Sequence, residues 1–389
     1  MSANRIAGYA AALLALVASG CQTISGTYDR LFGARPVVQK PAELVEIRSV
    51  VSPKILWQGS VGSADKNAFF PAVAGNVVYA AGASGQILGF DAANGRQVTR
   101  IEAGQRISGG VGAGGGLLLV GTAKGEVLAY HQDGKQLWKA QVSGQVLAPP
   151  RVGDGVIVAR AGDGRIFGLD STDGKRKWLY QRATPALSVR SHAGVVIYRG
   201  AVFAGFPGGR MVALALANGT LGWEAVVALP RGTTELERVA DIISPPLVDD
   251  RQACAVAFQG RVACFDVLRG AAMWARDVSS VAGMAADSRN FYITDDRNAV
   301  IALDKTNGAS VWKQDKLFGR GVSAPLAFGR HVVVGDFQGY VHFLSREDGS
   351  FAGRIATDGS AIITPPVALD PSSFVVQTRA GGVFAITVP

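Results

Sequence analysis

Residues 260–274 read GRVACFDVLRGAAMW: a glycine, an alternating apolar run that ends in an aspartate, a second glycine and a tryptophan. The same phrase recurs at residues 164–178 (GRIFGLDSTDGKRKW), 209–223 (GRMVALALANGTLGW) and 298–312 (NAVIALDKTNGASVW). With its shorter and more degenerate copies the phrase starts eight times, at residues 85, 125, 164, 209, 260, 298, 339 and 382. A repeat of about forty residues with strand-like content is typical of a β-propeller.

Each copy of the repeat has four strand-like parts. A short start led by proline, such as Pro150-Arg151-Val152, precedes a β-branched apolar run, and the alternating strand of the phrase follows. An Asn-Gly or Asp-Gly turn then leads to the strand that carries the tryptophan; this dipeptide between alternating runs is the strongest short-range hairpin signal. Four antiparallel strands make one propeller blade. The sequence therefore predicts an all-β, eight-bladed propeller of four-stranded antiparallel blades over residues 53–389.

The tryptophans predict how the ring closes. Five of the six stand four residues after a turn glycine, and we expect them to pack between blades rather than to stack on a ligand: Trp138, Trp178, Trp223, Trp274 and Trp312. Trp57 has no repeat in front of it, whereas the last copy, at residue 382, stops before its own tryptophan strand. We therefore expect residues 54–57 to supply the outer strand of the last blade, which would remove two exposed sheet edges.

The first fifty residues have no sustained periodicity. Residues 1–20 contain a basic start at Arg5, a short apolar run and the small residues Ala18-Ser19-Gly20 before Cys21, which resembles a bacterial lipoprotein signal. That resemblance implies a Cys21 that carries the lipid, including palmitate, and anchors the chain to the periplasmic face of the outer membrane. The alternative is an ordinary cleaved signal with an incidental cysteine. Residues 21–52 are predicted to be a tether between the lipid and the propeller.

The composition argues against several other functions. The net charge of +9 is spread thinly along the chain without a lysine- and arginine-rich run, so no nucleic-acid partner is predicted. The four histidines show no metal-binding spacing, and neither a metal site nor a cofactor is expected. Cys254 and Cys264 flank a Gln-Gly turn: a two-residue loop would point them to opposite faces, whereas a three-residue loop would align them for a disulfide.

The phrase (Ala/Gly)-x-Asp-x-x-(Asn/Asp)-Gly-x-x-x-Trp resembles the repeat of quinoprotein-like eight-bladed propellers, over residues 54–389. One such family contains enzymes, the pyrroloquinoline-quinone-dependent dehydrogenases. A second is the BamB family of lipoproteins, non-catalytic scaffolds of the outer-membrane β-barrel assembly machinery. The lipoprotein signal, the short chain and the lack of adjacent cysteines favour the second family, with the dehydrogenase kept as the alternative. The resemblance implies that the chain has no catalytic residue. It also implies that the chain assists the insertion of unfolded outer-membrane proteins.

Two long insertions predict a binding surface. The stretches from Trp178 to Ala201 and from Trp223 to Ala253 are the longest of their kind, and long loops on a rigid scaffold commonly bind partners. Their segments PALSVR and TELERVAD resemble those with which the BamB family docks the POTRA repeats of BamA, the core barrel protein. The resemblance and the mixed charged and apolar character of these loops imply the contact residues Leu187, Val189, Arg190, Glu235, Arg238 and Asp241. The family has a second acid where this chain has Ile243.

Overall fold

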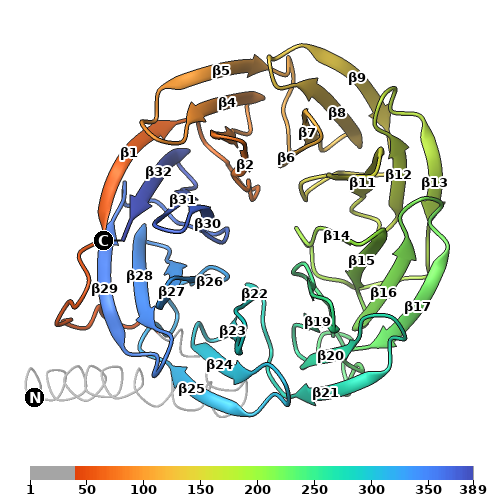
Figure 1. The fold of residues 1–389 in the computed structure, drawn as a ribbon. Helices are drawn as coiled ribbons and strands as arrows, with labels where there is room; N and C mark the ends of the chain where they lie inside the picture. Colours follow the sequence, from red (N-terminus) through yellow and green to blue (C-terminus); the bar gives the residue numbers. More distant parts are fainter. Residues whose placement is uncertain (1–39, 389) are drawn as a thin grey trace, which may run out of the picture. The chain divides into compact units, whose positions relative to one another are not determined.

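The computed structural model describes residues 40–388, and these form eight four-stranded antiparallel sheets arranged as the blades of a ring (Figure 1). Within the described residues all regular elements are strands, so the predicted eight-bladed β-propeller is confirmed. Hydrophobic clusters lie mostly between neighbouring blades; one of them joins Val158 of one blade to Val202 and Leu214 of the next. Burial between sheets therefore holds the blades in place.

The innermost strands vary from two to six residues, whereas the second strands all have five or six. The innermost strands are β2 (Ala72–Ala74), β6 (Gly109–Gly114), β10 (Arg151–Gly153), β14 (Val196–Tyr198), β18 (Leu247–Val248), β22 (Gly283–Ala286), β26 (Leu326–Phe328) and β30 (Val367–Asp370). The second strands are β3 (Val77–Ala81), β7 (Leu117–Gly121), β11 (Val156–Arg160), β15 (Ala201–Phe206), β19 (Gln252–Val256), β23 (Asn290–Thr294), β27 (His331–Gly335) and β31 (Ser373–Gln377). The second strands are buried along their length, except for one half-buried end residue in five of them.

The third and fourth strands carry the repeated phrase. The third strands are β4 (Gln86–Asp91), β8 (Glu126–His131), β12 (Ile166–Asp170), β16 (Arg210–Ala215), β20 (Val262–Asp266), β24 (Val300–Asp304), β28 (Tyr340–Ser345) and β32 (Gly382–Thr387). The outermost strands are β5 (Gln97–Glu102), β9 (Gln136–Gln141), β13 (Arg176–Tyr180), β17 (Leu221–Val226), β21 (Ala272–Arg276), β25 (Ser310–Gln314), β29 (Phe351–Ala356) and β1 (Lys54–Ser60).

The ring closes through the N-terminal strand. β1 pairs antiparallel with β32, with Trp57 opposite Ala385, in a sheet of order β1-β32-β31-β30 (Figure 1). The predicted closure is therefore confirmed, and the last blade combines strands from the two ends of the propeller. Pairing β1 with β32 covers an edge that would otherwise leave a row of backbone groups of β32 unpaired.

Each tryptophan of the repeat packs against the turn glycine of the next blade. A Cβ placed on the turn glycine of the following blade would lie only 2.5 Å from the Trp138 ring at Gly174 and 2.6 Å from the Trp178 ring at Gly219. Both glycines have φ of +72°, where a side chain is strained in any case. The Trp178 indole N–H donates to the Leu216 carbonyl at 2.8 Å, and the Trp178 side chain is buried. The expected packing of tryptophans between blades is confirmed.

One tryptophan lacks its hydrogen bond. The indole nitrogen of Trp274 is buried without a partner in the described structure, whereas that of Trp312 donates to the Arg346 carbonyl at 3.0 Å. The carbonyl at the corresponding place for Trp274 is that of Lys305, and it accepts instead from the side-chain amide of Gln252, at 3.3 Å. The repeat is therefore locally broken at this blade junction.

The two cysteines of the propeller form a disulfide. Cys254 on β19 stands opposite Cys264 on β20 and is bonded to it. The Ala257 N–H donates to the Arg261 carbonyl at 3.0 Å, which leaves a three-residue loop with Gln259 in the left-handed region. This is the odd-numbered loop that aligns the two side chains, so the structure resolves the alternatives that the sequence left open.

The segment before β1 follows the blade of β26–β29. The Arg320 guanidinium donates to the Ala42 carbonyl at 3.0 Å, and the Val50 N–H donates to the Ala352 carbonyl at 2.8 Å. This part of the predicted tether therefore contacts the propeller. The predicted signal residues 1–20, the predicted lipidation site Cys21 and the predicted tether up to residue 39 lie outside the described residues. Within residues 40–388 no helix has the length and apolarity needed to cross a membrane.

Candidate functional site

Two long connections adjoin one another in the ring. Residues 181–195 run from outer strand β13 to inner strand β14, and residues 227–246 run from β17 to β18, one blade further on. They are longer than the other six connections of this type. The Ser191 hydroxyl donates to the Ile243 carbonyl at 3.3 Å, so the two loops lie side by side as the sequence predicted. We call their combined exposed surface the two-loop surface.

Asp241 joins the two loops from beneath. Its side chain is only 1% exposed, and its carboxylate accepts hydrogen bonds from the N–H of Val189 at 2.7 Å and of Gly208 at 3.0 Å. The Asp241 backbone carbonyl accepts from the Phe258 N–H at 2.8 Å. Because the carboxylate is buried, it is not presented to a partner in this structure; it fixes the backbone on which Val189 stands.

The tip of the second loop, residues 232–238, is braced by its own side chains. The Glu237 carboxylate accepts from the N–H of Thr233 at 2.8 Å and of Thr234 at 3.2 Å, while the Thr234 hydroxyl accepts from the Glu237 N–H. This reciprocal pattern is that of a capping box. The backbone hydrogen bond from Thr233 is the main cause of the lowered pKa of Glu237. The exposed tip is therefore a defined turn.

The remaining predicted residues lie at the surface. Leu187 is 42% exposed, Val189 is half-buried, and Arg190 is exposed without an ion pair or side-chain hydrogen bond within residues 40–388. On the second loop Glu235 and Arg238 are exposed, 3.9 Å apart. The structure therefore places five of the six predicted residues on the two-loop surface and the sixth, Asp241, below it. Leu236, 71% exposed, adds an apolar side chain at the tip.

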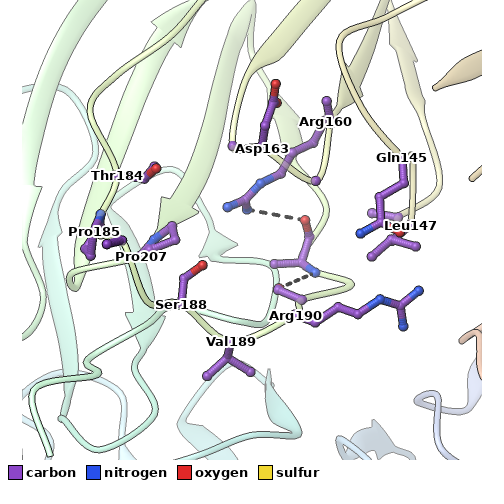
Figure 2. A pocket seen from close by; sticks show the side chains of 17 residues that line it. Gln145, Leu147, Arg160, Asp163, Thr184, Pro185, Ser188, Val189, Arg190 and Pro207 are labelled. Atoms are coloured by element: carbon purple, nitrogen blue, oxygen red, sulfur yellow. Dashed lines mark hydrogen bonds between the residues drawn. The ribbon is translucent and has the colours of Figure 1, made fainter. Parts of the chain in front are cut away.

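A pocket of about 440 Å³ lies beneath the first loop, between it and the blade of β10–β13 (Figure 2). Arg160, at the end of β11, projects into it, donates to the Ala193 carbonyl at 3.3 Å and stacks on Phe206, 5.1 Å from the ring centre. Burial lowers the pKa of Arg160 to about 10, opposed by the negative charge of Asp241. Arg160 is therefore held by the loop and helps to support it.

The sequence predicted the two loops but not that the side chains of Asp241 and Arg160 support them. Nothing in the local sequence distinguishes a buried acid from an exposed one at Asp241, because its hydrogen-bond partners come from other blades. Arg160 ends the β-branched strand VIVAR. In the same register the other second strands carry the uncharged residues Ala81, Gly121, Gly205, Val256, Thr294, Gly335 and Gln377. That charge at an otherwise uncharged register position was the available signal.

Within residues 40–388 no three histidine, cysteine, aspartate or glutamate side chains are grouped so as to hold a metal ion. His331 and His342 lie on adjacent strands, β27 and β28. His342 is buried, with Nε2 3.0 Å from Asp336 and Nδ1 accepting from Arg354 Nε at 3.1 Å, and desolvation is the main cause of its lowered pKa.

Comparison with known proteins agrees with this geometry. The family model described as outer membrane protein assembly factor BamB matches residues 83–314. A protein of that name from Nitrosomonas eutropha is 45% identical over 382 residues, covering 96% of this chain and 93% of the relative. The crystal structure of BamB from Moraxella catarrhalis superposes with a TM-score of 0.80 at 25% identity, covering 86% of this chain and 100% of that structure.

The enzymes of this fold are much more distant. Quinohemoprotein alcohol dehydrogenase from Comamonas testosteroni has a TM-score of 0.72 at 12% identity, and 86% of this chain covers 76% of that structure. That likeness shows the fold alone. The dehydrogenase alternative therefore has only the fold in its favour, whereas similarity along nearly the whole chain connects it to assembly factors. The chain belongs to the BamB family of outer membrane protein assembly factors.

Proposed function

We propose that the chain is a lipid-anchored scaffold on the periplasmic face of the outer membrane, and that its two-loop surface binds the POTRA repeats of a BamA-like core protein. The family supports the general role, and the lipoprotein-like signal at Cys21 supports the anchor. The structural observation that carries the proposal is the buried bridge from Asp241 to Val189 and Gly208, which pre-organises two exposed loops. Pre-organisation lowers the entropy cost of binding.

The exposed side chains fit a protein partner. Leu187 and Leu236 supply apolar area, while Arg190, Glu235 and Arg238 surround them with charge. A mixture of apolar centre and charged rim is typical of protein interfaces. Because Arg190 has no carboxylate partner in residues 40–388, an acidic side chain on the POTRA repeats would complete its interactions without breaking an existing ion pair.

The outer strands favour a second, weaker binding role. Each outermost strand is the last of its sheet, and several expose an apolar side chain beside or near the tryptophan, among them Leu56, Leu137 and Val311. An extended segment can add to such an edge through backbone hydrogen bonds. We propose that unfolded outer-membrane proteins make transient contacts of this kind while the core protein inserts them.

The test is affinity capture from detergent-solubilised membranes, with the bound proteins identified by mass spectrometry. The wild-type chain is expected to retain the core barrel protein, and Arg190→Glu is expected to lose most of it. Arg96→Glu is the matched control, because Arg96 is also exposed but lies on a hairpin turn of another blade. Equal recovery of the core protein by all three chains would refute the two-loop surface as the docking site.

A further inference from the structure

A second pocket lies at the centre of the ring. Residues of the two loops line part of it, and the other blades line the rest. It encloses about 580 Å³, and every blade or the connection leading into it contributes to its wall. The wall is mostly apolar, as shown by Pro71, Val111, Val196, Leu247, Met284 and Val367. Its volume falls in the range of about 300–1,000 Å³ that suits a small organic ligand. We call it the central pocket.

The charged side chains of the central pocket are all cationic. Arg151 and Arg190 line it, together with His192, and no aspartate or glutamate of the described residues does. Arg151 is on β10 and the other two are in the connection from β13 to β14, so all three approach from one sector of the wall. Figure 2 shows Arg190 extending away from the Arg160 guanidinium of the neighbouring pocket.

Arg151 breaks the pattern of the repeat. It is the first residue of its inner strand and pairs with Val158; the residues in the same register in other blades are the apolar Ala72, Val196, Leu247, Leu326 and Val367. An arginine at this position is not required by the fold, because other blades form without one. Arg151 is exposed, and within residues 40–388 its guanidinium has neither an ion pair nor a hydrogen bond. Nearby protein still lowers its pKa by desolvation.

His192 adds an unpaired polar atom to the same sector. Its Nε2 is buried and has no hydrogen-bond partner within residues 40–388. Burial, and then the charge of Arg190, lower the pKa of His192. A neutral imidazole can still donate one N–H to an anion. Two exposed guanidinium groups without ion pairs and one buried imidazole nitrogen without a hydrogen bond therefore line a mostly apolar cavity, and an anion could interact with all three.

We propose that the central pocket binds a single-chain amphiphile with a carboxylate head, such as a medium-chain fatty acid. The carboxylate would lie against Arg151 with His192 as a further donor, Arg190 would contribute only its positive charge, and the acyl chain would cover the apolar wall on the far side. An acyl chain suits this wall because the acyl chain carries no polar groups, whereas each residue of a peptide brings a donor and an acceptor that need partners.

The test uses the full chain in lipid nanodiscs and a photoreactive ten-carbon fatty acid, with the matching uncharged alcohol as control. Peptide mass spectrometry locates the labelled residues. Saturable labelling is expected on central-pocket residues such as Met284 and Val367, at concentrations at least tenfold lower for the acid than for the alcohol. Arg151→Leu introduces a residue that other blades carry in this register, and is expected to abolish the preference for the acid.

Two further arms keep the result decisive. Arg151→Lys retains a charge and is expected to keep a reduced preference for the acid, and Arg96→Leu, remote from the pocket, is expected to change nothing. Labelling of acid and alcohol at equal concentrations, labelling outside the central pocket, or an unchanged preference in Arg151→Leu would each overturn the proposal. So would stronger displacement by an apolar peptide with a free C-terminal carboxylate than by unlabelled decanoate. Partner capture is measured separately and does not enter this result.

Discussion

Single residues set the contact between blades. The turn glycine of one blade lies against the tryptophan of the blade before it, at a distance that excludes a Cβ, and its φ lies in the left-handed region. The repeated glycine and tryptophan are therefore two halves of one contact, although they are read in sequence as parts of separate hairpins. Because each of these hairpins supplies its glycine to one neighbouring blade and its tryptophan to the other, the spacing of four residues between them is kept in five repeats.

Gly174→Ala is expected to destabilise the propeller more than Gly75→Ala. Both positions have positive φ, so both substitutions cost about 1–2 kcal/mol in backbone strain. A Cβ at Gly75 meets nothing within 4 Å, whereas one at Gly174 would lie 2.5 Å from the Trp138 ring and add about 1–3 kcal/mol. Denaturant unfolding of both variants measures the difference. Equal losses would show that backbone strain alone selects glycine.

The broken indole contact gives a second residue-scale prediction. Trp312→Phe removes a donor to the Arg346 carbonyl and leaves that carbonyl without it, whereas Trp274→Phe removes an indole N–H that has no partner. We expect Trp312→Phe to cost about 1 kcal/mol more in the free energy of unfolding. The same unfolding titrations measure this, and a larger loss for Trp274→Phe would contradict the hydrogen-bond assignment.

At the scale of elements, one buried carboxylate of the second loop joins the first loop to a neighbouring hairpin turn. Asp241 bonds to Val189 in the first loop and to Gly208 in the turn between β15 and β16. Because Asp241 is charged and lies on a loop, the sequence predicted that it would contact a partner. Its burial shows instead that it supports the backbone of the first loop. The strand content, hairpins and blade number followed from local alternation, but this bridge depends on residues brought together from different blades.

Asp241→Ala is expected to loosen the first loop without removing an exposed side chain. Two buried N–H groups would lose their acceptor, at about 1–3 kcal/mol each where they remain buried. Amide hydrogen exchange at residues 185–191 should accelerate, and affinity for the POTRA repeats should fall although the exposed residues are intact. Glu235→Ala, at the exposed tip, is the control for the loss of an acid. Unchanged exchange at residues 185–191 would contradict the bridging role.

On the scale of the whole molecule, the chain ends close the ring. The Cys254–Cys264 register is set within one hairpin, whereas the N-terminal segment on the blade of β26–β29 and the β1–β32 pairing are non-local contacts. The sequence supported the last of these because Trp57 and the truncated final repeat complement each other. It left the cysteines open because loop length decides their register, and residues 42–51 carry no periodic signal that would predict their contacts.

Removing β1 is expected to open the ring. A chain that begins at residue 61 loses the outer strand of the last blade and the buried Trp57, whose loss alone costs about 3–5 kcal/mol. A chain that begins at residue 42, secreted behind the same cleavable signal, retains both. Thermal unfolding should show a much lower melting temperature for the shorter chain. Equal melting temperatures would contradict closure by the N-terminal strand.

The most direct test of the central claim is the dissociation constant between the purified chain and the POTRA region of the core protein. For Arg190→Glu we predict a loss of about 2–5 kcal/mol in binding free energy, at least tenfold in the dissociation constant, with the melting temperature unchanged. Leu187→Ala should weaken binding less, and Arg96→Glu should not weaken it. An unchanged dissociation constant for Arg190→Glu, or its unfolding in parallel with lost binding, would contradict the two-loop surface as the docking site.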